Sequence, residues 1–141
     1  MIIYHNKNYD KFNNIIFGNK LKYSDNFTFI SIKNCIFQTP LLFCPFGIQK
    51  TKNNKNIIDL SFQNKYNDKS LNKLLKLLKK IYSSIYDIYN KSYKVNEFIK
   101  MTKYNEECIR FKILNSTKIY DDNKNILNTI NNFTYGNYII Q

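Results

Sequence analysis

Residues 69–90, KSLNKLLKLLKKIYSSIYDIYN, contain the strongest structural signal in the sequence. Its apolar side chains recur at intervals of three and four residues, which is the spacing of one face of an α-helix. This apolar stripe consists of Leu71, Leu74, Leu75, Leu78, Ile81, Tyr82, Ile85, Ile88 and Tyr89. Asp68 or Ser70 can accept hydrogen bonds from the backbone of the first turn. The pattern predicts one long amphipathic helix that packs against the rest of the chain.

A second stripe of the same helix is basic. It consists of Lys69, Lys73, Lys76 and Lys80. Such a stripe could meet a polyanion, but the charged face of an amphipathic helix usually lies in solvent. We interpret it as a solvated face.

Short apolar segments on both sides of the helix predict β-strands. They are residues 27–37, 57–62, 109–114 and 135–141. In the second, Ile58, Leu60 and Phe62 share one face because side chains alternate along a strand. Several short strands around one long helix predict a single α+β domain over residues 1–141.

Alternation in residues 109–114 also separates apolar from basic side chains. It predicts that Ile109, Phe111 and Ile113 point inward, whereas Arg110 and Lys112 project outward together. Two turns are predicted elsewhere, a hairpin turn at 18–19 and an acidic turn at 121–124.

The composition is strongly basic. The chain has 22 Lys and Arg against 10 Asp and Glu, a net charge of +12. Such an excess attracts nucleic acid, an anionic membrane or an acidic protein. Residues encoded by AT-rich codons dominate, so codon bias explains part of the lysine excess.

The remaining composition sets the expected compartment. We expect a soluble intracellular protein without a membrane partner, because we see neither a signal peptide nor a long apolar span. Cys35, Cys44 and Cys108 are odd in number and widely spaced, which argues against a disulfide framework.

Residues that would support catalysis are sparse. His5 is the only histidine, and three glycines cannot build a phosphate-binding loop. Asp121 and Asp122 are adjacent in a turn, where aspartate commonly makes local hydrogen bonds. We therefore expect no enzyme activity, no catalytic residue, no metal site and no cofactor.

Binding of single-stranded nucleic acid has more support, because it needs cations for phosphates and exposed rings for bases. Tyrosine and phenylalanine are interleaved with basic residues in several places. In one of them, Phe43 and Phe46 are followed by Lys50 and Lys52. The candidate contacts are Lys50, Lys52, Tyr66, Tyr104, Arg110 and Lys112. The competing interpretation is that most phenylalanines lie in the core and most lysines in solvent.

One segment is more specific than composition. Residues 37–47, FQTPLLFCPFG, contain Gln-Thr-Pro and, four residues later, Pro-Phe-Gly. Residues 58–62, IDLSF, and the long helix follow. This order resembles the phage-type single-stranded DNA-binding proteins of nucleocytoplasmic large DNA viruses.

The resemblance covers about residues 27–141 and implies an OB-like antiparallel β-barrel with the helix inserted between strands. It implies sequence-tolerant binding of single-stranded DNA during viral DNA replication, recombination or repair, in the host cytoplasm or the virion. In such a barrel Pro40 and Pro45 would stiffen a crossing, Gly47 would allow a sharp turn, and Phe46 would plug the barrel end.

The chain departs from these proteins in two ways. Those proteins continue past the equivalent of Gln141 into tryptophan- and glycine-containing strands and often carry an acidic tail, and we expect neither feature here because the sequence has no tryptophan and ends on a predicted strand. We therefore expect a truncated or divergent member, in which a second copy or a viral protein partner could complete the barrel. The alternative is a virion structural or protein-interaction component that uses the same fold without binding DNA.

Overall fold

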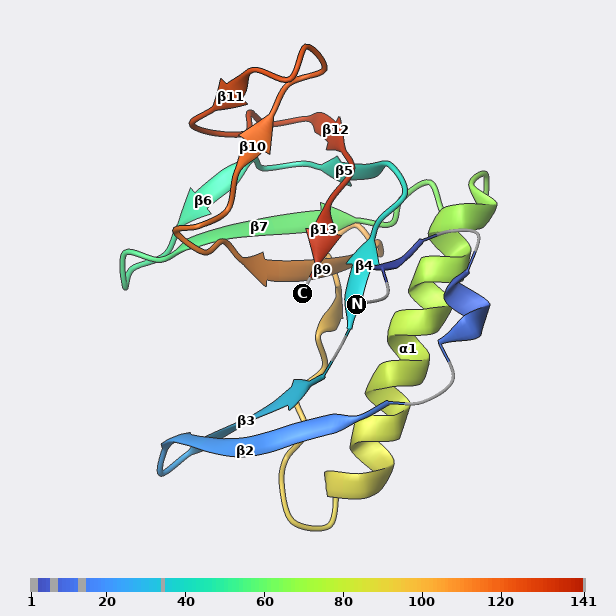
Figure 1. The fold of residues 1–141 in the computed structure, drawn as a ribbon, viewed down its shortest axis with the longest axis vertical. Coiled ribbons are helices and arrows are strands. Elements are labelled where there is room, and N and C mark those ends of the chain that lie inside the picture. The colour runs from blue at the N-terminus through green and yellow to red at the C-terminus, as the bar shows by residue number, and fades with distance from the viewer. Residues whose placement is uncertain (1–2, 6–7, 13–14, 34, 141) are drawn as a thin grey trace.

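The computed structural model describes residues 3–5, 8–12, 15–33 and 35–140. They form an α+β fold with one α-helix and mostly antiparallel sheets, which confirms the predicted class. Figure 1 shows the helix along one side of the sheets, with one β-hairpin at the bottom of the view and another at the top.

The predicted helix is α1, Lys69–Tyr89. Asp68 caps it, because Oδ1 accepts hydrogen bonds from the backbone N–H groups of Ser70 (2.8 Å) and Leu71 (3.3 Å). Its buried residues are Leu71, Leu74, Leu75, Leu77, Leu78 and Ile81. The four lysines of the basic stripe are all exposed, which confirms the interpretation of a solvated face.

The largest sheet has six strands in the order β12-β5-β7-β9-β8, and β6 also pairs with β7. The strands are β5 Leu42–Cys44, β6 Ile48–Lys50, β7 Asn56–Ser61, β8 Ile99–Met101, β9 Glu107–Lys112 and β12 Thr134–Gly136. β7 and β9 correspond to the strands predicted at 57–62 and 109–114, each displaced slightly toward the N-terminus.

A smaller sheet places β4, Ile36–Gln38, between β1, Ile3–Tyr4, and β13, Ile139–Ile140. A corner at Thr39 joins β4 to β5, opposite the connection from β12 to β13. The buried Thr39 donates its N–H to the carbonyl of Tyr138 (2.8 Å), and its hydroxyl accepts from the N–H of Tyr138 (2.8 Å). The two bent strands therefore remain paired as they pass from one sheet to the other.

Two hairpins complete the fold: β2 Phe17–Ser24 with β3 Phe27–Ile32, and β10 Ile119–Tyr120 with β11 Ile126–Leu127. The predicted turn at Gly18 and Asn19 is wrong, because both residues lie inside β2. The register of β2 against β3 shifts there, so the glycine marks an irregularity within a strand. The acidic turn at 121–124 is confirmed, and it connects β10 to β11.

Two predicted strands are each divided. Residues 27–37 form β3 and β4, because the first part pairs with β2 and the second with β1 and β13. Residues 135–141 likewise contribute to β12 and β13, while residue 141 lies outside the described part.

The core combines the apolar face of the largest sheet with the apolar stripe of α1. Leu42, Leu60, Phe62, Leu74 and Cys44 are its most completely buried side chains. Ile109 is buried and Phe111 and Ile113 pack against the core, as alternation predicted. Tyr9 and Phe12 join it from the N-terminal segment, at and just after the short helix η1, Tyr9–Lys11.

The predicted OB-like barrel is not confirmed. In the described part of the chain the largest sheet is open, with β12 and β8 at its edges. Phe46 is 51% exposed, so the prediction that it plugs a barrel end is wrong. Gly47 does provide the sharp turn, with a φ of 62°.

Candidate nucleic-acid interface

The two predicted rings lie on neighbouring loops. Tyr66 follows β7 and is 87% exposed, and Tyr104 lies in the turn between β8 and β9 and is 70% exposed. The Nζ atoms of Lys65 and Lys103 each lie 4.9 Å from the centre of the adjacent ring. These loops meet where β7 ends and β9 begins, because Phe62 N–H donates to the carbonyl of Glu107 (2.9 Å).

The predicted lysines lie toward the other end of the same strands. Lys50 pairs with Asn56 across β6 and β7, and Lys112 pairs with Ile57 across β9 and β7. Lys52 lies in the turn that connects β6 to β7. Because Asn56 and Ile57 are successive residues, Lys50 and Lys112 point to opposite faces of the sheet. The structure therefore does not bring all six predicted residues together.

Arg110 lies midway between the two ends. It projects with Lys112 from the face of β9 opposite the core, and both side chains are exposed, as alternation predicted. Its Nε donates to Asp59 Oδ1 at 2.7 Å and its Nη2 to Asp59 Oδ2 at 2.8 Å. These hydrogen bonds raise the pKa of Arg110.

A row of side chains crosses this face of the sheet. We define the outer face as the face of the six-stranded sheet opposite α1 and the core. Register places five residues of successive strands side by side on it: Tyr135, Phe43, Ser61, Cys108 and Lys100. The row has two rings at one end and an exposed lysine at the other, with small side chains between them.

Rings gather at the β12 end of the row. We call Phe43, Phe133 and Tyr135 the aromatic cluster. The centre of the Phe43 ring lies 5.0 Å from that of Tyr135 and 6.4 Å from that of Phe133, with which it is stacked. Phe133 is 75% exposed and Tyr135 is 50% exposed. Large rings on an open strand face are unusual, because apolar strand residues normally lie in the core.

Phe133 also has a strained backbone. Its φ is 58°, a left-handed conformation that costs a bulky residue about 1–2 kcal/mol. Two hydrogen bonds hold this turn. The Phe133 N–H donates to the carbonyl of Pro45 (3.3 Å), and the Thr134 hydroxyl donates to the carbonyl of Asn131 (2.9 Å). The hydrogen-bonded turn therefore keeps an aromatic side chain exposed beside Phe43 in spite of this backbone strain.

Neither this cluster nor Lys100 was predicted from the sequence. Phe43 belongs to a basic and aromatic run and Tyr135 to a predicted strand, but neither pattern indicates that the two rings meet. The alternation of Phe133 and Tyr135 around Thr134 was the available signal. Their meeting with Phe43 depends on a strand register that joins residues far apart in the sequence.

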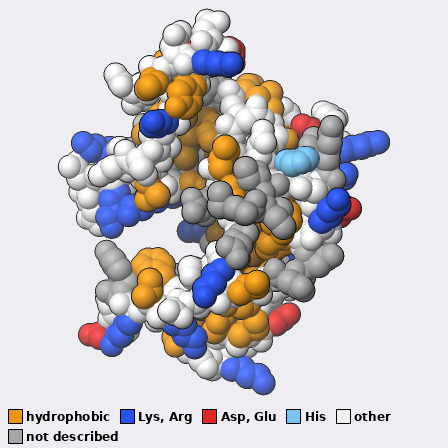
Figure 2. All heavy atoms as spheres, viewed as in Figure 1, with side chains coloured by type: hydrophobic (Ala, Val, Ile, Leu, Met, Phe, Trp, Pro, Cys, Tyr) orange, Lys and Arg blue, Asp and Glu red, His pale blue; other side chains and the backbone are white. Residues whose placement is uncertain are grey.

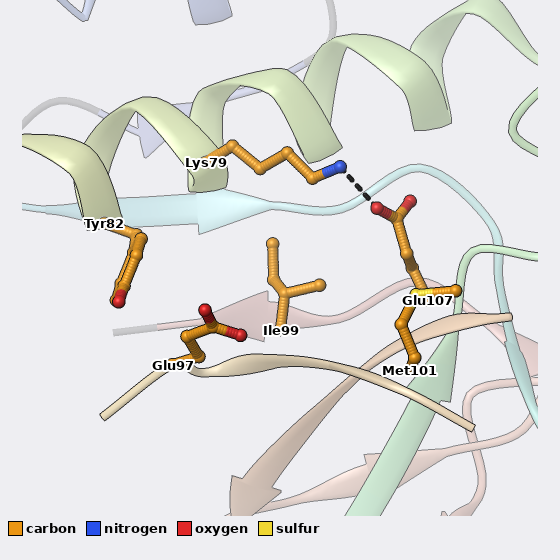
Figure 3. Close-up of a pocket in the computed structure, with 6 residues that line it drawn as sticks. All are labelled: Lys79, Tyr82, Glu97, Ile99, Met101 and Glu107. Carbon is orange, nitrogen blue, oxygen red and sulfur yellow. Dashed lines mark hydrogen bonds and ion pairs between the residues drawn. The ribbon is translucent and has the colours of Figure 1, made fainter. Parts of the chain in front are cut away.

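A separate pocket lies between α1, β8 and β9 (Figure 3). Its volume is about 220 Å³, and it is lined by Lys79, Tyr82, Glu97, Ile99, Met101 and Glu107. Glu107 is mostly buried and pairs with Lys79 and with Lys65, the latter at 2.8 Å. Burial alone would raise the pKa of Glu107, but the two lysines outweigh it and lower that pKa. The pocket is smaller than most ligand sites, which measure roughly 300–1,000 Å³. Two of its charged groups, Lys79 and Glu107, already pair with each other, so we do not assign it a ligand.

On the face drawn in Figure 2, the positive charge is not concentrated in one patch. Figure 2 shows Lys and Arg side chains spread over much of the visible face, with hydrophobic side chains between them. The outer face contributes Arg110, Lys112 and Lys100, of which Arg110 is already paired with a carboxylate. The aromatic cluster, rather than charge density, distinguishes this face.

The comparisons with known proteins add no relative. No protein-family model matches the chain, and no curated protein or solved structure matches it. The family that the sequence resembles therefore stays a prediction. No helix in the described part of the chain is long and apolar enough to cross a membrane.

Proposed function

We propose that the chain binds single-stranded DNA without strong sequence preference, through the outer face of its six-stranded sheet. The observation that carries this proposal is that exposed, mutually packed rings share the outer face with Arg110, Lys100 and Lys112. In the setting that the resemblance implies, the DNA would be a viral replication, recombination or repair intermediate.

The chemistry of the row suits unpaired bases. Every base has a flat face, and stacking on an aromatic side chain contributes about 1–3 kcal/mol per base whatever the base is. A duplex hides these faces, so exposed rings favour single strands. The flanking cations would neutralise phosphates and make the affinity depend on salt.

We propose that the bent pair formed by β4–β5 and β12–β13 is part of an OB-like barrel that remains open at β8. A second copy or another protein chain adding a strand at that edge would complete it. The support for this is the continuous pairing of the two bent strands around the corner at Thr39.

The test is a titration of a fluorescent oligo(dT) and of a duplex of equal length at several salt concentrations. We expect tighter binding of oligo(dT), with an affinity that falls as salt increases. Because a tenfold change corresponds to about 1.4 kcal/mol, replacing both Phe133 and Tyr135 by alanine should weaken oligo(dT) binding by roughly tenfold or more.

The matched control is Phe27→Ala, which removes a 55% exposed ring from the β2–β3 hairpin and should leave the affinity unchanged. Equal losses in the control and in the double variant would contradict the assignment to the outer face. Absence of binding to either probe at low salt would overturn the proposed function.

A second function, as a protein-interaction or virion structural component, is favoured by the β2–β3 hairpin. Its Leu21 pairs with Phe29 across the strands, and with Phe27 these side chains form a half-exposed apolar face. This hairpin projects from the rest of the molecule in Figures 1 and 2. If the titration shows no binding of oligo(dT) or of the duplex, this second function becomes the better supported of the two.

A further inference from the structure

The ion pair between Asp59 and Arg110 is asymmetric in its burial. Asp59 is a buried residue of the central strand β7, with 7% of its surface exposed, whereas the Arg110 side chain is 61% exposed. Both carboxylate oxygens accept a hydrogen bond from the guanidinium. A carboxylate fixed in the sheet therefore holds an exposed, planar cation in one orientation.

This geometry leaves much of the guanidinium available to a ligand. Arginine has five N–H donors, and the Asp59 contacts use two of them, which leaves three. A guanidinium plane also stacks on a nucleobase, and its remaining donors suit phosphate oxygens. A lysine at this position could offer neither the plane nor the paired donors.

The position of Arg110 relates it to the aromatic cluster. Arg110 of β9 pairs with Asp59 of β7. Two residues further along β7, Ser61 pairs with Cys108 of β9 on one side and with Phe43 of β5 on the other. Because residues two apart share a face, Arg110 and Phe43 lie on the same side of the sheet, on strands separated only by β7. One DNA strand crossing this face would meet both.

We propose that Asp59 is a positioning residue that holds Arg110 as a second stacking surface for an unpaired base. This inference rests on the proposed function. It leads to an unusual expectation, because removing an acidic residue from a basic DNA-binding protein should ordinarily strengthen binding. If Asp59 positions Arg110, its removal weakens binding despite the gain of one positive charge.

The experiment compares Asp59→Asn with Asp25→Asn in the full chain. Asp25 also pairs with a basic residue, Lys22 at 2.9 Å, but it lies at the tip of the β2–β3 hairpin. Both variants change the net charge by the same amount. The probes are oligo(dT) and an abasic oligonucleotide of equal length, which keeps the phosphates and removes the stacking partner.

We expect Asp59→Asn to bind oligo(dT) at least about fivefold more weakly than the wild type, with little change for the abasic probe. Asp25→Asn should bind both probes as well as the wild type or slightly more tightly. Thermal unfolding of each variant checks that it is folded. Should Asp59→Asn unfold, Arg110→Lys tests the stacking surface itself, because it keeps the charge and lacks the plane, and unchanged oligo(dT) binding by that variant would overturn the proposal.

The outcomes separate the two proposals. If the wild type does not bind oligo(dT), the proposed function fails and this inference fails with it. If the wild type binds and Asp59→Asn behaves as Asp25→Asn does, the proposed function stands and the positioning role is overturned. A loss of equal size on the abasic probe also overturns it, because stacking would not be involved.

Discussion

At the scale of a single residue, Glu107 connects β9 to α1 and to the loop that precedes α1. It begins β9, and its carboxylate pairs with Lys79 of α1 and with Lys65 of the loop that precedes α1. A mostly buried carboxylate needs such partners, because an unpaired charge is costly away from water. Figure 3 shows Lys79 reaching from the helix to this carboxylate.

Replacing Glu107 by glutamine should therefore destabilise the fold in a pH-dependent way. Because folding lowers the pKa of Glu107, its ionised carboxylate stabilises the folded state fully at pH values above the pKa of glutamate in the unfolded chain, about 4.3. This effect disappears as pH falls through the lower pKa of the folded protein. We expect the variant to be about 1.5–3 kcal/mol less stable at pH 7, and the difference to shrink below about pH 4.

Urea unfolding of both proteins from pH 7 to pH 3 measures this difference. The control is Glu97→Gln, because Glu97 lines the same pocket but is exposed and should contribute little. A difference that stays constant with pH would show that Glu107 acts through packing rather than charge.

At the scale of elements, the connection between β5 and β6 depends on Gly47. Its φ is 62°, and a Cβ atom there would lie 2.3 Å from the carbonyl oxygen of Ile130. We expect Gly47→Ala to cost at least about 2 kcal/mol, from the left-handed backbone together with the clash.

The comparison for this prediction is Gly18→Ala in β2. The nearest atom to its added Cβ is the movable hydroxyl of Ser31, so the cost should be smaller. Thermal unfolding of both variants measures the two costs. An equal effect would mean that the turn at Gly47 can rearrange.

The elements that the sequence predicted well are those whose signals are local. The helix 69–90 repeats its apolar residues over six turns and has a capping aspartate, so its pattern needs no information from elsewhere. β7 and β9 alternate cleanly. β2 was missed because Gly18-Asn19 is a common turn pair, and in the structure it produces an irregular register inside the strand.

The candidate interface was much less predictable for the same reason. Tyr66 and Tyr104 were predicted as base contacts, a role that needs exposed rings, and both are exposed. The aromatic cluster instead requires β5 to pair with β12, whose residues are about ninety positions apart. No local pattern specifies that register, and the pairing of Arg110 with Asp59 depends in the same way on β7 meeting β9.

At the scale of the whole molecule, stability should be uneven. β7 lies between other strands of the six-stranded sheet, whereas β2 and β3 pair only with each other in the described residues. A two-stranded hairpin is marginally stable by itself. Phe17 and Lys20 do contact Tyr89 near the end of α1, which attaches one side of the hairpin.

We therefore expect the backbone amides of β2 and β3 to exchange with deuterated solvent at least about tenfold faster than those of β7 and β9. Native-state hydrogen exchange followed by NMR measures both sets in one sample. Equal protection would mean that the hairpin unfolds only together with the core.

The pairing of β4 with β13 has a consequence for biosynthesis. It joins Phe37 to Ile140, and the corner at Thr39 depends on Tyr138, so neither can form until these late residues have left the ribosome. The helix α1 can form early, but β4 lacks β13 and β5 lacks β12 until residues 134–140 have emerged from the ribosome. A pause just before that point would leave an exposed apolar edge, the situation in which a chaperone is most useful.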